Sequence, residues 1–423
     1  MIPASQQWRQ LSVAIIGGGI GGLAAATSLR RTGHRVTIYE RGDYSGSLGA
    51  SISCGANGTK WLNEWNVDIS HGRPSTIRKL IRHALNNGEI QGIYDLSEYP
   101  GKWGYEYYNF FRADMHAMLM KSATGPGLGE PALLKRYHSC NSVDHATGTV
   151  RFQNDVIVRH DLVIGADGVG SSVRRALGTA DVRRLGLADM SQNDALEYWG
   201  GQGLEKIVFA PCREGEIHSF YIFFPTPKNE KEEQVEEGWD FAGDRRQLLA
   251  PFPTLDPALH ALFSHADPVD IRPWRLFAHE PYPYWSRGRT CILGDAAHPM
   301  LPDQSQGACQ AIEDAAALGI IFGRSYQYTN DIRSGLQLYE EVRKPRASKV
   351  QAASARAREN ISERIGFSSQ KNSRWYAVVE EDQKLTIEEI NDYDIRQHIR
   401  KQAAQEYSDL YPGWRLASTS QQS

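Results

Sequence analysis

The chain has 423 residues, of which 41% are hydrophobic, and this predicts a folded protein with a large core built from two or more packed units. The formal net charge is −3, so there is no basic excess that would hold a nucleic acid or an acidic membrane. The five cysteines are odd in number and include no C-x-x-C pair, so we expect no disulfide framework, no metal site and a reducing, cytoplasmic compartment.

The first predicted elements lie in an uncharged run over residues 11–29, which by length alone could span a membrane. Five glycines between Gly17 and Gly22 would make a poor spanning helix. Residues 12–16 are apolar and partly β-branched, as in a buried parallel strand, and residues 23–29 favour a helix. We therefore predict a strand, a tight turn and a helix, with no stable membrane insertion.

The turn carries a glycine pattern that is typical of dinucleotide-binding units. Gly17 permits the tight turn, Gly19 lets the backbone approach a pyrophosphate, and Gly22 lets helix and strand pack closely. A second strand is predicted over residues 35–40, and its last residue, Glu40, is placed to accept the hydroxyls of a ribose. The order of strand, helix, strand and acid predicts a bound dinucleotide, although this spacing alone does not separate NAD from FAD.

Two further buried strands run into turns that carry an acid. Residues 161–166 lead into Asp167-Gly168, which on its own is as consistent with a structural turn as with a binding site. Residues 290–294 lead into Asp295, which either accepts a polyol hydroxyl or caps the following helix. The helix that begins near Gly307 presents N–H groups that favour negative charge.

Together with the sequence Phe111-Arg112-Ala113-Asp114-Met115-His116, these motifs carry a resemblance to a known family. From about residue 11 to residue 346 the chain resembles the single-component FAD-dependent aromatic hydroxylases, in the branch of salicylate hydroxylase and 6-hydroxynicotinate monooxygenase. The order and spacing of the motifs are specific, whereas no single motif is. The resemblance implies FAD as the bound cofactor, with NADPH or NADH as a transient reductant. No second glycine fingerprint follows, so we expect no separate Rossmann domain for the reductant.

The resemblance also implies which residues bind FAD. Glu40 would bind the adenosine ribose, Arg112 the flavin or its phosphates, and Asp295 the ribityl chain. The full set that it implies for the cofactor is Gly17, Gly19, Gly22, Glu40, Arg41, Ala50, Arg112, Asp167, Asp295, Pro302, Gly307 and Ala308.

The expected fold class is α/β, with a Rossmann-like FAD-binding domain, a second, mainly β substrate domain and a C-terminal helical region. We place the discontinuous FAD-binding domain at residues 11–75, 112–180 and 288–346. The substrate domain would take 76–111 and 181–287, and the helical region 347–423, with a disordered end. The charged run over 229–237 is expected to be a solvated excursion from the sheet, and the protein a monomer or homodimer.

The activity that the resemblance implies is insertion of one oxygen atom from O2 into a small aromatic or conjugated molecule through a flavin C4a-hydroperoxide. The candidate substrate wall comprises residues 197–199, 206–210 and 216–224, where alternating side chains suit one face of a sheet. Candidate catalytic residues there are Arg184, as a substitute for an arginine common in relatives, together with His218 and Tyr221. For His218, an exposed or core position is the alternative that we favour.

The chain departs from the family pattern at this wall. Ala210 stands where relatives often carry a tyrosine, and Ser305 stands beside the flavin where glycine is usual. The resemblance places Tyr339, Arg343 and Arg346 on a helix that closes the flavin domain, but we favour a solvated, basic amphipathic helix for them. A flavin halogenase is one alternative function, although the W-x-W-x-I-P signature is missing. A catalytically silent flavin-binding protein is another.

Overall fold

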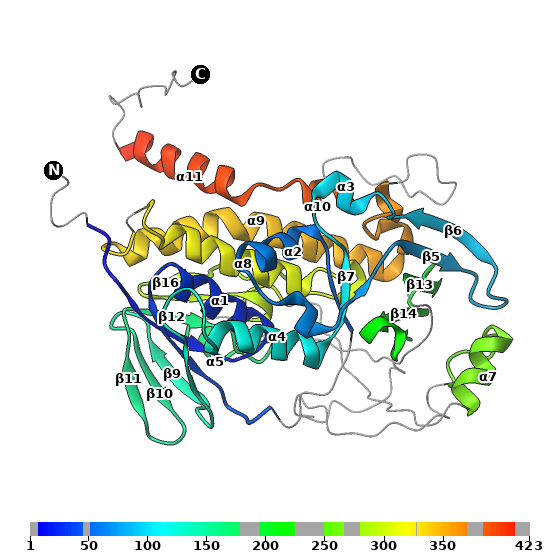
Figure 1. Ribbon diagram of the computed structural model, residues 1–423, viewed down its shortest axis with the longest axis horizontal. Coiled ribbons are helices and arrows are strands. Elements are labelled where there is room, and N and C mark those ends of the chain that lie inside the picture. The colour runs from blue at the N-terminus through cyan, green and yellow to red at the C-terminus, as the bar shows by residue number, and fades with distance from the viewer. Residues whose placement is uncertain are drawn as a thin grey trace.

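The computed structural model describes residues 7–44, 51–177, 194–224, 249–265, 280–326, 328–369 and 384–410. It is an α/β structure in which two large sheets lie at different ends of the molecule, with helices between and beside them (Figure 1). This agrees with the fold class expected from the sequence. Arg184, Ala50 and the charged run over 229–237 lie outside the described residues.

The first sheet has six strands and contains the predicted nucleotide-binding unit. Its strands, in spatial order, are β16 (Ser286–Arg287), β17 (Thr290–Ile292), β12 (Leu162–Gly165), β1 (Ser12–Ile16), β2 (Arg35–Tyr39) and β8 (Leu133–Lys135). All neighbouring pairs are parallel except β16 and β17. Parallel strands are buried on both faces, which explains the continuous apolar runs of β1 and β12.

Helices cover this sheet and connect its strands. Helix α1 packs against both α8 and α4, and a small antiparallel sheet packs against α5. The helix bounds are α1 (Ile20–Arg31), α4 (Arg112–Thr124), α5 (Ser172–Leu177) and α8 (Gly307–Ile321), and the small sheet is formed by β9 (Cys140–Asp144), β10 (Thr149–Phe152) and β11 (Ile157–Arg159). The uncharged run over residues 11–29 is therefore divided into β1 and α1, as predicted. Across the described ranges, no helix is both long and apolar enough to cross a bilayer.

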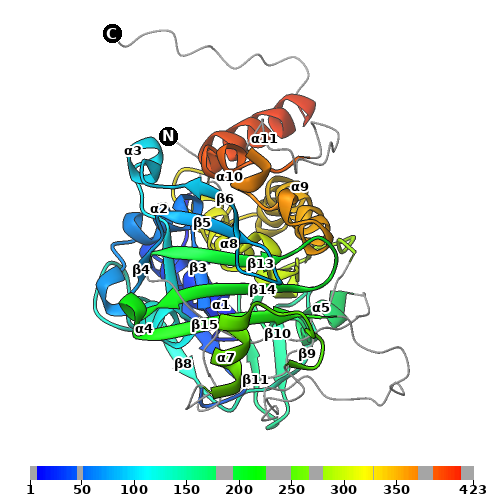
Figure 2. The ribbon, with the colours of Figure 1, turned by 90° about the vertical axis from the view of Figure 1, so that its right-hand side faces the viewer.

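The second large sheet has five strands, and in Figure 2 its strands β5, β13, β14 and β15 run across the view next to one another. Its spatial order is β15 (Ile217–Phe223), β14 (Lys206–Cys212), β13 (Ala195–Gly200), β5 (Lys79–His83) and β6 (Ile90–Asp95). One face packs on α7 (Pro257–His265) through a cluster that includes Trp199, Phe209, Phe220 and Phe263. The opposite face bears the side chains that alternate with these.

Short elements join the two large sheets. A three-stranded sheet contains β3 (Ser51–Cys54), β7 (Tyr108–Phe111) and β4 (Ser75–Thr76). The short helices are α2 (Ala56–Glu64), α3 (Tyr99–Trp103), η2 (Ile69–Gly72), η3 (Arg213–Gly215), η4 (Gly294–Ala296), η5 (Pro302–Gln304), η6 (Ile361–Glu363) and η7 (Phe367–Ser369). The domain boundaries predicted from the sequence stay a prediction. The pairing of strands shows which segments share a sheet, but it does not show where one domain ends and the next begins.

The C-terminal part is helical, with α9 (Ile332–Glu359), α10 (Ile387–Asn391) and α11 (Ile395–Leu410). The prediction of a solvated helix around Tyr339, Arg343 and Arg346 is wrong. Tyr339 and Arg343 have no exposed surface, and the side chain of Arg346 is only 9% exposed. The acids that neutralise these arginines are Glu313 and Asp314, which lie on α8, the helix that precedes α9 in the chain.

Candidate active site

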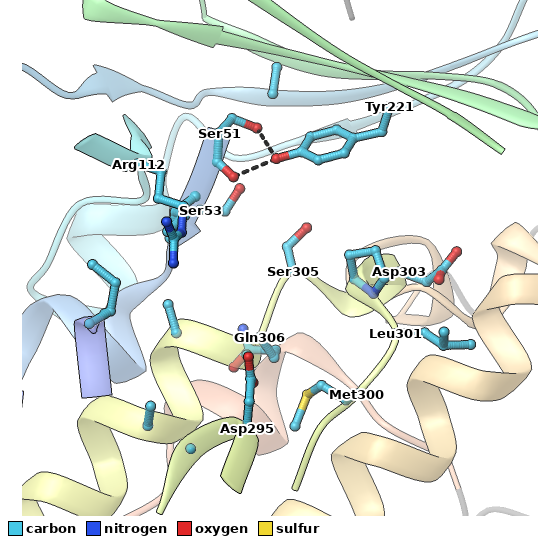
Figure 3. A pocket seen from close by; sticks show the side chains of 18 of the residues that line it. Ser51, Ser53, Arg112, Tyr221, Asp295, Met300, Leu301, Asp303, Ser305 and Gln306 are labelled. Carbon is cyan, nitrogen blue, oxygen red and sulfur yellow. Dashed lines mark hydrogen bonds between the residues drawn. The ribbon is translucent and has the colours of Figure 1, made fainter. Parts of the chain in front are cut away.

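A cavity of about 340 Å³ lies between the ends of the six-stranded sheet and one face of the five-stranded sheet (Figure 3). Its walls come from parts of the chain that are far apart in sequence. They include the start of α1, strand β3, the start of α4, the turn after β12, three strands of the five-stranded sheet and the loop over residues 293–308. The cavity therefore lies beyond the carboxyl ends of parallel strands, where α/β sheets commonly bind ligands.

The glycine turn before α1 has no room for side chains on the side that faces β12. It has open space on the side that faces the cavity. Gly17 has a φ of +103°, and a Cβ there would lie 2.3 Å from the carbonyl oxygen of Ala166. A Cβ on Gly22 would lie 2.0 Å from the Gly17 oxygen, whereas nothing lies within 4 Å of the Cβ position of Gly19. The helix N-terminus is thus close to β12 and open to the cavity, which suits an approaching anion.

Glu40 holds this turn in place. Its two carboxylate oxygens accept hydrogen bonds from the backbone N–H groups of Gly18, at 2.8 Å, and Gly42, at 2.9 Å. Arg41 is exposed beside it. The residues that line the cavity do not include Gly17, Gly22, Glu40 or Arg41, so the cavity meets this turn at Gly19, next to the start of α1.

Asp167 acts within its own loop. Its carboxylate accepts from the Ser171 hydroxyl at 2.5 Å and from the Ser172 N–H at 2.7 Å, so it caps α5. Burial raises the pKa of this carboxyl, and the bond from Ser171 opposes that change. The neighbours of Asp167, Ala166 and Gly168, line the cavity.

Arg112 and Asp295 bring opposite charges to the cavity from different elements (Figure 3). Arg112 begins α4 directly after β7, and Asp295 lies in η4, which is separated from the end of β17 by one residue. The Asp295 side chain is exposed to the cavity. Burial lowers the pKa of Arg112 and raises that of Asp295, and the attraction between the two groups opposes both shifts.

The loop before α8 forms another wall, and Pro302, Gly307 and Ala308 line the cavity there. Nothing lies within 4 Å of the Cβ position of Gly307, so the N-terminus of α8 faces open space. Ser305 has a φ of 53°, in the left-handed region that favours glycine. This conformation gives a physical reason why glycine would suit the position.

Behind the start of α8, a buried ionic network ties the helix to α9. Arg343 donates to Glu313 at 2.7 Å and to Asp314 at 2.8 Å, and Arg346 donates to Glu313 at 2.7 Å. Asp314 also accepts from the Gly294 N–H at 3.0 Å, next to Asp295. The network therefore fixes both the loop that carries Asp295 and the helix that begins at Gly307.

One face of the five-stranded sheet forms the remaining wall, with every second residue pointing into the cavity. The contributing residues are Leu196 and Tyr198 from β13, Lys206, Val208 and Ala210 from β14, and Tyr221 and Phe223 from β15. Cross-strand register places Tyr198 opposite Val208, and Val208 opposite Tyr221. Among these lining residues only Lys206 is charged; Arg82 of β5 lies on the same face, opposite Tyr198 in the register, but does not line the cavity.

That charged residue, Lys206, forms a buried ion pair on the cavity wall. Its ammonium lies 2.5 Å from Oδ1 of Asp303 and donates to the carbonyl oxygen of Ala357 at 2.7 Å. Burial lowers the pKa of Lys206, and Asp303 opposes the shift. Within the described part of the chain, Oδ2 of Asp303 is buried without a hydrogen-bond partner, and Tyr198 lies beside the Arg364 guanidinium, 5.1 Å from its ring centre. The side chains of Lys206 and Asp303 are at most 1% exposed, so the charged pair lies directly behind this wall of the cavity.

The three predicted catalytic residues have different placements. Tyr221 lines the cavity, where its hydroxyl donates to the Ser51 carbonyl at 2.5 Å and accepts from the Ser51 hydroxyl at 2.8 Å (Figure 3). His218 is exposed and is not among the lining residues, because strand alternation puts it on the opposite face from Tyr221. Arg184 lies outside the described residues, as does Ala50 from the predicted cofactor set.

Sequence reasoning placed Lys206 in the substrate wall but missed its pairing with Asp303. One signal was present: Lys206 shares the period-two pattern of Val208 and Ala210, so it points to the same face. A lysine on the buried face of a strand requires a partner.

Comparison with known proteins gives consistent matches over most of the chain. A family model described as FAD binding domain matches residues 10–354. FAD-dependent monooxygenase cfoG of Aspergillus candidus is 32% identical over 373 residues, covering 81% of this chain and 84% of the relative. The 6-hydroxynicotinate 3-monooxygenase of Bordetella bronchiseptica is 30% identical over 361 residues, covering 81% and 90%. A solved salicylate hydroxylase substrate complex superimposes with a TM-score of 0.70 at 23% identity, covering 92% and 97%.

Proposed function

This chain belongs to the FAD binding domain family and is an FAD-dependent monooxygenase, and we propose that it adds one oxygen atom to a small aromatic or conjugated molecule held beside Lys206 and Asp303. The resemblance to FAD-dependent aromatic hydroxylases inferred from the motifs is confirmed. The names of these relatives do not favour a halogenase.

The residues around the cavity fit FAD. Two helix N-termini open onto it, and nothing lies within 4 Å of the Cβ positions of Gly19 and Gly307. Unpaired N–H groups at these ends suit the anionic parts of such a cofactor. When bound, FAD supplies the redox chemistry, taking a hydride from NAD(P)H and activating O2. Arg112 and Asp295 would bind it inside the cavity, with Gly17, Gly22 and Glu40 shaping the turn at its nucleotide end.

The buried Lys206–Asp303 pair is the observation that carries the proposal for the substrate. Oδ2 of Asp303 has no hydrogen-bond partner among the described residues, and a substrate hydroxyl at this end of the cavity would donate its proton to it. This transfer requires the Asp303 side chain to turn toward the cavity, because it has no exposed surface in this structure. The Lys206 ammonium would then stabilise the negative charge left on the substrate oxygen. An ionised hydroxyl makes the attached ring richer in electrons. The apolar face formed by Leu196, Val208 and Phe223 would hold that ring and exclude water.

The proposed function is tested by a screen of phenolic acids, indoles and polyketide-like phenols for stimulation of NADH and NADPH oxidation by the FAD-loaded protein. A product heavier by one oxygen atom is expected, and an additional loss of CO2 would identify decarboxylative hydroxylation. The same screen run with each nicotinamide identifies the reductant. Absence of oxygenated product from every compound would contradict the proposal.

The role of Asp303 is tested with the isosteric variant Asp303→Asn, which keeps the shape of the site but removes the proton acceptor. We expect the yield of oxygenated product per NAD(P)H oxidised to fall sharply, with a loss of about 100-fold in oxygenation rate. Asp331→Asn, at the exposed N-cap of α9, is the control, since asparagine caps as well as aspartate. An unchanged rate with Asp303→Asn would remove this residue from the mechanism.

A further inference from the structure

Two buried cysteines lie next to each other behind a wall of the cavity. Cys54 ends β3, and Cys309 is the third residue of α8. Neither residue has any exposed surface. A Cβ on Gly58 of α2 would lie 2.7 Å from Sγ of Cys54 and 3.1 Å from Sγ of Cys309. The two sulfur atoms therefore meet at one place, where a glycine leaves room for them.

Hydrogen bonds prepare one of the two sulfurs to act as a nucleophile. The Thr59 hydroxyl, which donates to the Cys54 carbonyl at 3.1 Å, also donates to Sγ of Cys54 at 3.6 Å. The bond from the Cys309 thiol lowers the pKa of Cys54, with burial opposing that change, and the same bond raises the pKa of Cys309. Both cysteines lie at the N-terminal ends of helices, α2 and α8, where partial positive charge favours a thiolate. Because the thiolate is the reactive form, Cys54 is the better nucleophile of the pair.

The pair lies directly behind two residues of the cavity. Ser53 precedes Cys54, Ala308 precedes Cys309, and both Ser53 and Ala308 line the cavity. Reduction of O2 by two electrons without oxygen insertion gives hydrogen peroxide, so an FAD-dependent monooxygenase produces this oxidant whenever the oxygen atom is not transferred. The two sulfurs are therefore placed next to a source of peroxide.

We propose that Cys54 and Cys309 form a redox modification site, at which hydrogen peroxide converts the two thiols into a reversible disulfide that links β3 to α8. The Cys54 thiolate attacks one peroxide oxygen, the O–O bond breaks, and the hydroxide that leaves takes up the proton lost by Cys54 and becomes water. Cys309 then attacks the sulfur of the resulting sulfenic acid, the S–O bond breaks, and a second water leaves. The two sulfurs lose two electrons in total, and the peroxide is reduced to water.

The disulfide would join two walls of the cavity that fits FAD. Strand β3 contributes Ser51, Ile52 and Ser53 to the lining, and the start of α8 contributes Gly307 and Ala308. A cross-link between these walls limits how far they separate. We therefore expect the oxidised protein to release FAD about tenfold more slowly, which corresponds to about 1.4 kcal/mol, and dithiothreitol to restore the original rate. The return of flavin fluorescence after dilution measures this release.

Treatment of the FAD-loaded protein with hydrogen peroxide, followed by disulfide mapping, tests the modification itself. Remaining thiols are blocked with iodoacetamide in urea, and peptides are analysed by mass spectrometry without reduction. Trypsin alone leaves Cys291 and Cys309 on one peptide, so a second cleavage before Asp303 separates them. We expect a linked pair of peptides, one with Cys54 and the other with Cys309. The link should be lost when dithiothreitol is added before the blocking step.

Variants separate the roles of the two sulfurs. In Cys309→Ser, oxidation of Cys54 should stop at the sulfenic acid, which dimedone labels, whereas Cys54→Ser should leave Cys309 as a thiol. Cys140→Ser is the matched control, because it removes another buried cysteine, whose pKa is raised by burial, and should keep the disulfide. FAD content checks that each variant is folded, and mapping of the unmodified protein decides the proposal if a variant does not fold.

The proposal is overturned if peroxide leaves Cys54 and Cys309 as thiols, or if it oxidises them without linking them. An unchanged rate of FAD release from the cross-linked protein would overturn the effect on the cavity walls. All of these measurements are made without a substrate, so their failure is distinct from a failure to find oxygenated product.

Discussion

Single residues explain why one end of the site was predictable from sequence and the other was not. Gly17 and Glu40 belong to a local pattern of strand, turn and strand, so their roles follow from neighbours in the chain. Lys206 and Asp303 are 97 positions apart, and neither has a motif around it. Their pairing depends on how the five-stranded sheet meets the loop before α8, which no local pattern contains.

Ser305 gives a prediction at this scale. Its left-handed conformation, with a φ of 53°, costs a residue with a side chain about 1–2 kcal/mol. Ser305→Gly should remove this strain, and the greater freedom of glycine in the unfolded chain offsets about half of it. We therefore expect the free energy of unfolding to rise by about 0.5–1 kcal/mol in urea denaturation of the FAD-loaded protein.

Ser305→Ala is the control for that experiment, because alanine removes the hydroxyl but keeps the strain. Its stability should stay at or below that of the unmodified protein. Equal gains from glycine and alanine would show that the hydroxyl, and not the backbone conformation, limits stability there.

At the scale of elements, strand β15 and helix α9 show what periodicity can and cannot predict. Alternation along β15 is visible in the sequence, and it separates Tyr221, in the cavity, from His218, which is exposed. The same kind of reasoning failed for α9. A helix face with Arg343 and Arg346 looks solvated unless the acids of α8 are known to lie against it.

The contact between α8 and α9 yields the second prediction. Arg343→Met would leave Glu313 and Asp314 buried with less compensation, and breaking such a pair costs about 3–5 kcal/mol. We expect a loss of that size in urea denaturation, together with weaker retention of FAD, since the network supports the loop around Asp295.

Arg333→Gln serves as the comparison, because this arginine is exposed on the same helix. It should change stability by no more than about 0.5 kcal/mol. A similar loss in both variants would mean that the helix is sensitive to any change and that the buried network has no special weight.

For the whole molecule, His34 links the start of the chain to the end of α8 and makes stability depend on pH. Its Nδ1 accepts from the Leu11 N–H at 3.1 Å, and its Nε2 lies 3.0 Å from the Phe322 carbonyl. Burial lowers the pKa of His34 to about 4. The neutral ring fits both contacts, whereas a protonated ring would lose the acceptor that Leu11 uses.

Because the folded pKa lies below the usual value of about 6.5, the unfolded chain binds a proton first as the pH falls. Stability should therefore decrease between about pH 6.5 and pH 4, by up to about 3 kcal/mol from this residue, and no further below that range. Urea denaturation from pH 7 to pH 4 measures the slope. In His34→Gln the slope over this window should be smaller, and parallel profiles would rule out this histidine as its source.

The alternation of side chains on β13, β14 and β15 also bears on how such enzymes diversify. Substitutions at Leu196, Val208 and Ala210 would reshape the cavity, while the intervening residues keep the sheet packed on α7. None of these three lies on the loops around Gly19 or Asp295. After gene duplication, a descendant can therefore acquire activity on a substrate of a different shape through point mutations on one sheet face. A library of variants restricted to these three codons would explore cavity shapes without changing the loops around Gly19 and Asp295.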